Sequence, residues 1–92
     1  MELTDKVAIP AQVMARQVGE EVVILDLAGG SYFGLDPVGA RIWQLIGEGS
    51  TLAEICEMML EEYEVEREQL ETDVFRLTGE LLERGLVVLA TY

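Results

Sequence analysis

Few residues of this sequence could take part in catalysis, and the strongest candidate is a single cysteine. The chain contains one cysteine, Cys56, and no histidine. Without histidine it lacks a Ser-His or Cys-His pair for nucleophilic catalysis and an imidazole ligand for a metal ion. Cys56 lies in a helical pattern between Glu54 and Glu57, and neighbouring carboxylates raise the pKa of a thiol. We therefore expect Cys56 to be a core residue and the protein not to be an enzyme.

Two further segments resemble ligand sites only in composition. The glycines of AGGSYFG, residues 28–34, precede a strand pattern and lack the GK[ST] of a phosphate loop. The segment from Glu48 to Asp73 holds ten carboxylates against Arg67 alone, without the alternating aspartates of a calcium loop. We interpret this acidic segment as a solvated helical surface, and we predict neither a metal nor a cofactor.

The overall charge excludes several classes of partner. Eighteen Asp and Glu against six Lys and Arg give a formal net charge of −12 at pH 7. Nucleic acids and anionic membranes attract basic patches, which this sequence does not have. No apolar run reaches the roughly 18–20 residues of a membrane span. The segment MELTDKVAIPAQ lacks the basic and apolar regions of a signal peptide. We predict a cytoplasmic protein that binds neither nucleic acid nor membrane, with residues 1–92 as a single domain.

The first third of the sequence predicts a three-stranded antiparallel meander. Residues 12–17, 20–28 and 31–35 have strand patterns, and the second is the richest in β-branched side chains. Its four consecutive apolar residues, 22–25, suit a central strand with both faces covered. Short glycine-containing segments separate the three runs and predict hairpins. The third strand, residues 31–35, would then pair on one side only.

Three helices are predicted after the strands. The dipeptide Asp36-Pro37 combines a good N-cap with a proline at the first helical position, so a helix begins directly after the third strand. Thr51 and Glu54 form the capping-box pattern that opens a second helix. A third helix covers about Glu66 to Arg84 and is followed by a glycine that suits its C-terminus. Strands followed by helices predict an α+β domain.

The third helix has a wider apolar surface than one core contact requires. Its main stripe consists of Leu70, Val74, Leu77 and Leu81. A second group, Phe75, Thr78 and Leu82, lies roughly 110° further round the helix. Two interpretations are open: the C-terminal residues LVVLATY fold back, as a short strand, and cover this group, or the group lines a groove beside the unpaired third strand. An edge strand flanked by a helix can accept an extended peptide as an additional strand.

The ordered combination of two segments resembles the PqqD-like family. They are YFGLDPVGARIWQLI, residues 32–46, and LAEICEMMLEEYEVEREQLETDVFRLTGELLERGLV, residues 52–87. This family comprises the peptide-recognition elements of pathways that modify ribosomally made peptides. The resemblance extends from about Gln12 to Val87. A free-standing domain of this length is most similar to the discrete leader-binding protein of lasso-peptide biosynthesis.

The resemblance implies both a fold and a binding mode. Family members have a winged helix-turn-helix-like fold, with a three-stranded sheet packed on three helices, and they do no chemistry. They hold the leader of a precursor peptide as an additional antiparallel strand between the third strand and the third helix. In lasso pathways a separate cysteine protease then removes the leader. Carried over to this sequence, the expected peptide-binding residues are Ser31, Tyr32, Phe33, Gly34, Leu35, Val74, Phe75, Arg76, Thr78 and Leu82.

Three other functions fit parts of the pattern. A PqqD-type peptide chaperone for a radical SAM enzyme would have the same fold. A winged-helix DNA-binding protein has a related fold, but residues 66–84 carry three arginines against six carboxylates, which DNA would repel. An acidic carrier protein needs an all-helical bundle with a modified serine at a helix start. Ser50 has that position, but it follows a strand-rich segment. We therefore favour peptide recognition.

Overall fold

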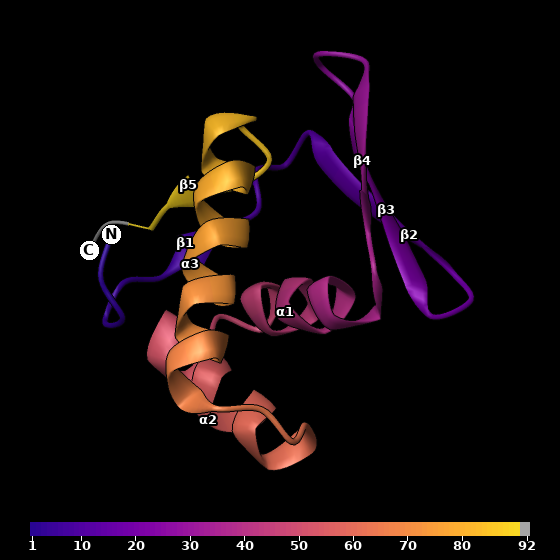
Figure 1. The fold of residues 1–92 in the computed structure, drawn as a ribbon. Coiled ribbons are helices and arrows are strands. Elements are labelled where there is room, and N and C mark those ends of the chain that lie inside the picture. Colours follow the sequence, from indigo (N-terminus) through magenta and orange to yellow (C-terminus); the bar gives the residue numbers. More distant parts are fainter. Residues whose placement is uncertain (91–92) are drawn as a thin grey trace.

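Three consecutive strands form the main sheet. The computed structural model describes residues 1–90, and in it β2 (Val13–Val18), β3 (Glu21–Asp26) and β4 (Ser31–Leu35) pair antiparallel in the order β2-β3-β4. The two hairpin turns contain Gly19 and Gly30 at φ values of 67° and 72°, a left-handed conformation that glycine adopts without strain. The predicted meander is confirmed, and Figure 1 shows it standing beside the helices.

β4 is an edge strand within the described part of the chain, because it pairs with β3 and with no other strand. Val22 lies opposite Leu35, and Ile24 opposite Phe33. The first three of these side chains are buried and Phe33 is half-buried, so this face of the sheet packs toward the helices. Alternate residues such as Tyr32, which is 75% exposed, point to the opposite face.

The junction between β4 and α1 (Pro37–Gly47) is a single residue, Asp36. Its carboxylate Oδ1 accepts a hydrogen bond from the backbone N–H of Gly39 at 2.8 Å, and Pro37 occupies the first helical position. The predicted strand-to-helix junction is confirmed, and it holds the first turn of α1 beside the end of β4. One side chain differs from expectation: Val38, which the helical period places on the inner face, is 41% exposed.

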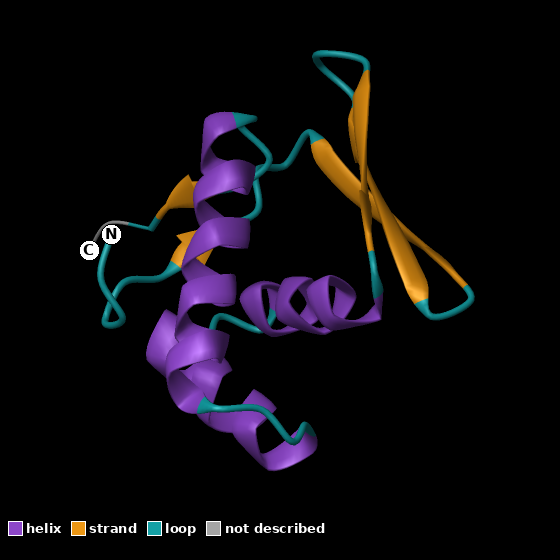
Figure 2. Cartoon of the chain, viewed as in Figure 1, coloured by secondary structure: helices purple, strands orange, loops and turns teal. Residues whose placement is uncertain are grey.

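α2 (Leu52–Glu62) and α3 (Arg67–Glu83) complete the predicted set of helices. In α2 both bonds of the capping box form: Thr51 Oγ1 accepts from the Glu54 N–H at 3.1 Å, and the Glu54 carboxylate accepts from the Thr51 N–H at 2.8 Å. These bonds hold the pKa of Glu54 below its ordinary value. Figure 2 shows α3 running alongside β4, with α1 crossing near the end of that strand.

One hydrophobic core joins the inner face of the sheet to the three helices. The main stripe of α3 is buried as predicted: Leu70, Val74, Leu77 and Leu81. Cys56 is 1% exposed within this core, so its interpretation as a core residue is confirmed. Burial raises the pKa of the Cys56 thiol, and the nearby carboxylate of Glu71 raises it further.

A second, small sheet joins β1 (Val7–Ala8) to β5 (Val88–Leu89) in antiparallel pairing. A short C-terminal strand was one interpretation of the sequence, whereas β1 and its pairing with that strand were not predicted. Leu86 and Val87, just before β5, are buried, so the C-terminal segment folds back; residues 91–92 of that segment lie outside the described residues. The α+β, winged helix-turn-helix-like fold class is confirmed, with this small sheet as an addition. Among the described residues, no helix combines the length and apolar composition that a membrane span requires.

Candidate functional site

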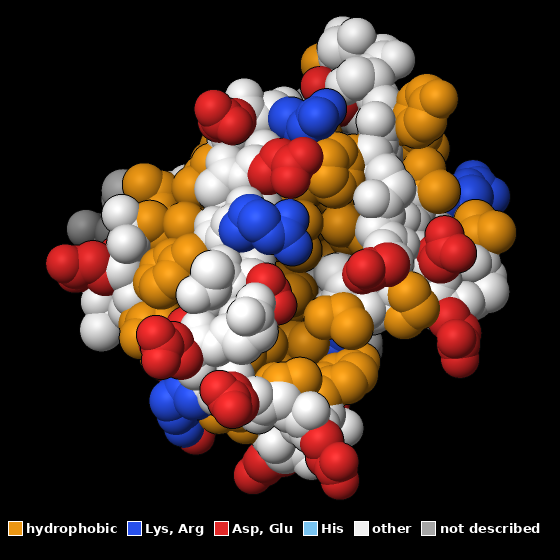
Figure 3. Space-filling view, viewed as in Figure 1, with side chains coloured by type: hydrophobic (Ala, Val, Ile, Leu, Met, Phe, Trp, Pro, Cys, Tyr) orange, Lys and Arg blue, Asp and Glu red, His pale blue; other side chains and the backbone are white. Residues whose placement is uncertain are grey.

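A cleft of about 460 Å³ lies between the edge strand β4, the first turns of α1 and the middle of α3. Its lining residues are Phe33, Gly34, Leu35, Asp36, Val38, Gly39, Ile42, Asp73, Arg76, Leu77 and Glu80. In the space-filling view of Figure 3, hydrophobic side chains lie in the hollow between α3 and the sheet, and charged side chains of both signs flank them on the α3 side.

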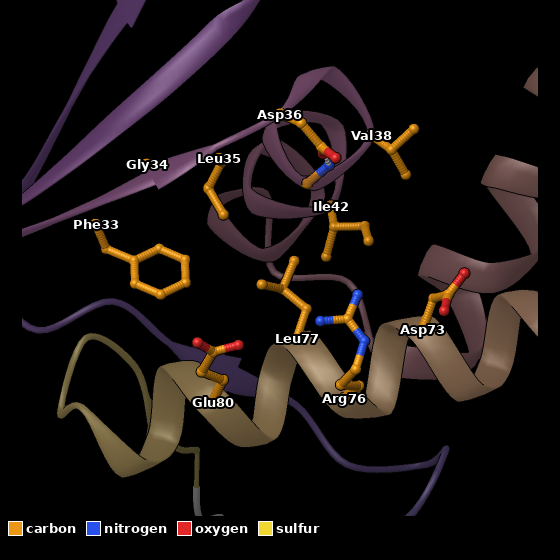
Figure 4. A pocket seen from close by; sticks show the side chains of 11 residues that line it. Phe33, Gly34, Leu35, Asp36, Val38, Ile42, Asp73, Arg76, Leu77 and Glu80 are labelled. Carbon is orange, nitrogen blue, oxygen red and sulfur yellow. Dashed lines mark hydrogen bonds between the residues drawn. The ribbon is translucent and has the colours of Figure 1, made fainter.

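The floor of the cleft is apolar. Leu35, Ile42 and Leu77 come from three different elements and converge there, and each is less than 9% exposed. Val38 remains 41% exposed at one end (Figure 4). α1 can approach this closely because position 39 is glycine: an added Cβ would lie 3.2 Å from Leu35 Cδ2. The floor is therefore the outer edge of the hydrophobic core, and Val38 is its most exposed apolar neighbour in the cleft.

Phe33 forms the opposite end of the cleft, and a cation–π contact ties it to α3. The Arg84 guanidinium carbon lies 4.8 Å from the centre of the Phe33 ring. Arg84 also lies 3.7 Å from the carboxylate of Glu80, one turn earlier on α3. The cation–π contact joins the end of α3 to β4, and the Glu80 carboxylate lies beside the same guanidinium.

The strand side of the cleft offers backbone hydrogen-bonding groups. In an antiparallel ladder each strand directs alternate N–H and C=O groups to each side, so the edge of β4 leaves some of its groups without a strand partner. Gly34, in the middle of β4, has no atom within 4 Å of the position that a Cβ would occupy. An extended peptide can therefore approach the edge of β4 while its side chains rest on the apolar floor.

The structure brings four of the ten sequence-predicted binding residues to the cleft. Phe33, Gly34, Leu35 and Arg76 line it. Ser31 and Tyr32 belong to the same edge strand, but the Tyr32 side chain is 75% exposed on the opposite face of the sheet. These two residues can contribute backbone groups to the edge without lining the cleft.

The other four predicted residues lie elsewhere on α3. Val74 and Thr78 are fully buried in the core, and Leu82 is half-buried against it. Phe75 is also half-buried and lines another, shallow hollow on α3, which shares Arg76 and Glu80 with the cleft. The structure therefore does not bring Val74, Phe75, Thr78 or Leu82 to the cleft.

The residues of α3 that line the cleft and the second apolar group of the sequence prediction lie on opposite flanks of the helix. Residues Asp73, Arg76 and Glu80 lie on one side of the buried stripe, and the group Phe75, Thr78 and Leu82 lies on the other side at 100° per residue. Only the first flank faces β4. The missed residues of α1, Val38 and Ile42, could have been inferred from the single-residue junction after β4, which places the first helical turn beside the strand.

A second hollow of about 730 Å³ lies on a different face of α1, against the β2–β3 hairpin. It is lined by Ala15, Gln17, Glu20, Val22, Pro37, Ala40, Arg41, Trp43, Gln44 and Tyr63. Arg41 donates to both carboxylate oxygens of Glu62 at 2.8 and 2.5 Å, and this pairing lowers the pKa of Glu62. Arg41, the cation in this hollow, is thus already paired with a carboxylate, and the edge strand beside the hollow is β2 instead of β4.

No cluster of three or more metal-ligating side chains occurs within residues 1–90. The features of the first cleft instead define a class of domain: an α+β, winged helix-turn-helix-like fold with an accessible strand edge beside a helix. The particular family follows from the sequence, because the model of coenzyme PQQ synthesis protein D (PqqD) matches residues 21–87. The chain belongs to the PqqD family.

Two solved structures have the same fold over nearly their whole length. TbiB1 in complex with the TbiA(beta) leader peptide is 39% identical, with a TM-score of 0.83, and the match covers 92% of this chain and 96% of that one. A lasso peptide synthetase B1 complexed with its leader peptide is 29% identical, also with a TM-score of 0.83, and covers 90% and 98%. No curated protein matches the sequence.

Proposed function

We propose that this protein binds the leader of a ribosomally made precursor peptide, as an additional strand on β4, in the biosynthesis of a lasso peptide. The observation that carries the proposal is the edge of β4 beside a cleft with an apolar floor. The two similar solved structures, both complexes with a leader peptide, support it. Backbone hydrogen bonds to β4 would supply affinity, and the apolar floor would select the leader side chains that fit.

The cleft suggests a revised set of contacts for the leader. From the sequence-predicted set we keep residues 31–35 and Arg76. The buried residues Val74 and Thr78 support the wall from inside, and Phe75 and Leu82 face away from the leader. In their place we propose Val38, Ile42, Asp73, Leu77 and Glu80 as leader contacts.

We propose that the protein is not an enzyme and presents the bound leader to a separate leader-processing cysteine protease. Cys56, the only nucleophilic thiol, is buried and its pKa is raised, which argues against catalysis by this residue. Because ribosomally made precursor peptides are synthesised in the cytoplasm, we propose that the protein acts there. The protease step is tested by the rate at which the pathway protease cleaves the precursor with and without this protein. An unchanged rate would remove presentation from the proposal and leave leader binding intact.

A PqqD-type chaperone for a radical SAM enzyme is the second candidate, favoured by the description of the matching family model. The two similar solved structures are both complexes with a leader peptide, one of them of a lasso peptide synthetase B1, and they favour the first candidate. DNA binding is disfavoured, because within residues 66–84 six carboxylates face three arginines. A carrier protein is disfavoured, because the all-helical bundle it needs is replaced here by an α+β fold.

Amide hydrogen exchange tests the site directly, with the TbiA(beta) leader peptide of the 39% identical relative as the probe. Leader binding should slow exchange in β4, because its outward N–H groups gain partners, and should leave β2 unchanged. β2 is the matched control, since it is the other edge of the same sheet. Protection of β2 with no change in β4 would place the peptide at the second hollow and refute the proposed site.

A further inference from the structure

Three charged side chains of α3 form the wall of the cleft that faces β4. They are Asp73, Arg76 and Glu80, and Figure 4 shows them projecting from the side of the helix that also carries Leu77. Their charges alternate along the helix as negative, positive, negative. The cleft is therefore not a neutral apolar groove: a strand on its floor would also pass a patterned row of charges.

Arg76 differs from the other arginines of the helical part of the chain. The others form ion pairs, which are Arg41 with Glu62, Arg67 with Glu57, and Arg84 with Glu80. Arg76 is exposed and forms no ion pair within residues 1–90, although its two acidic neighbours are close along the helix. Glu80 lies 3.7 Å from Arg84, and Asp73 accepts a hydrogen bond from Gln69 at 3.1 Å. The guanidinium of Arg76 thus keeps its donors available at the cleft.

The spacing of these charges matches that of a strand. Arg76 and Glu80 are separated by four residues, about 6 Å along a helix axis. Side chains on one face of a strand repeat about every 6.6–6.8 Å. Because α3 lies alongside β4 (Figure 1), a strand added to β4 would present consecutive side chains of one face to Arg76 and Glu80. Arg76 and Glu80 can therefore each contact a different side chain of the leader, two residues apart in its sequence.

We propose that Arg76 binds a carboxylate side chain of the leader, and that the next leader residue on the same face, opposite Glu80, is not acidic. This inference rests on the proposed function and names the substrate class more closely: leaders with Asp or Glu at one fixed position of the docked strand. A net charge of −12 disfavours acidic peptides in general, so an acidic side chain is favoured only where a cation meets it. An arginine fork can bind that carboxylate through two parallel hydrogen bonds.

The test is a charge-swap titration. The probes are the TbiA(beta) leader peptide and a set of variants in which each residue in turn is replaced by Glu, Gln or Lys, titrated by fluorescence anisotropy. The proteins are wild type, Arg76→Gln, Arg76→Glu and the control Arg16→Glu. Arg16 is exposed on β2, outside the cleft, and gives the same change in net charge. Thermal melts establish that every variant is folded.

At one leader position, wild type and Arg16→Glu should bind the peptide with Glu at that position about tenfold more tightly than the peptide with Lys there. Arg76→Gln should abolish this preference, and Arg76→Glu should reverse it in favour of Lys. Identical preferences in wild type and in both Arg76 variants would overturn the inference while leaving leader binding intact. Failure of wild type to bind any peptide of the set would instead overturn the proposed function.

Discussion

Val38→Asp should separate leader binding from folding. Val38 lies in the first turn of α1, is 41% exposed, and lines the cleft. Its removal should cost the fold little, because the side chain is only partly buried and an acidic residue in the first helical turn interacts favourably with the helix dipole. A bound leader would cover the exposed part of this side chain, so the substitution acts mainly on the complex.

The size of the effect follows from the exposed fraction. Complete burial of a valine side chain is worth about 1.5–3 kcal/mol. The 41% still exposed therefore corresponds to about 0.6–1.2 kcal/mol of binding free energy. Placing a polar or charged group against an apolar leader side chain adds roughly 1–3 kcal/mol. Together these contributions should weaken leader binding by at least about tenfold, with the melting temperature close to that of wild type.

The assay is an anisotropy titration of the labelled TbiA(beta) leader peptide, with thermal melts of each protein. The matched control is Val65→Asp, which makes the same chemical change at a residue that is 45% exposed and lies outside the cleft. Wild type and Val65→Asp should bind alike. If folded Val38→Asp binds as tightly as Val65→Asp, the leader does not rest on this end of the cleft and the reasoning is refuted.

Four further outcomes are expected. In a set of leader peptides that each carry one N-methylated backbone amide, binding measured by anisotropy should weaken by up to about tenfold when the methyl group is at every second residue, because alternate N–H groups bond to β4. Affinity losses that do not alternate along the leader would argue against strand addition. Cys56→Ala should lower the free energy of unfolding by at most a few kcal/mol in urea melts and leave leader affinity unchanged; loss of binding in the folded variant would contradict its structural role. Thr51→Ala should cost about 0.5–2 kcal/mol of unfolding free energy, since it removes one of the two capping-box bonds. Because the pKa of Glu54 is lowered in the folded state, chiefly by the hydrogen bond from the Thr51 backbone N–H, its stabilisation is present above its ordinary pKa and lost as the pH falls through the lowered value. Melts of wild type and Glu54→Gln should therefore differ near neutral pH and converge in acid.

Local chemistry made much of the fold predictable. Asp36 and Thr51 mark helix starts because their side-chain oxygens can accept hydrogen bonds from backbone N–H groups two or three residues later, and both bonds form. Gly30 marks a turn because its positive φ is cheap only for glycine. These signals depend on residues that are neighbours in the sequence, so no knowledge of the tertiary structure was needed to interpret them.

The contacts of the cleft depended on information that is not local. The period of α3 shows that Phe75 and Arg76 lie on different flanks of the buried stripe, but it does not say which flank faces the sheet. That choice depends on how α1 and α2 direct the chain before α3 begins. Val38 illustrates the same limit, because the helical period places it on the apolar side of α1 but does not show that it lies at the mouth of a cleft, 41% exposed.

The small sheet was missed for a related reason. β1 and β5 have two residues each, too few for an alternating pattern, and they are separated by most of the chain. The burial of Leu86 and Val87 and the pairing of β5 with β1 show that the C-terminal segment folds back. Folding back was one of two interpretations that the sequence allowed, and it leaves a cleft on the other flank of α3.

The single-residue junction at Asp36 has a consequence for how such a protein could diversify. One continuous segment, from β4 through the first turns of α1, contains both the backbone edge and most of the floor, including Leu35, Val38 and Ile42. The edge works with almost any side chain, whereas the floor side chains decide which leader fits. A few substitutions within this short segment could therefore change which leader sequence binds, while the leader still docks as a strand on β4. We expect that replacing residues 31–47 of one relative by the corresponding residues of another would transfer much of the second protein's leader preference.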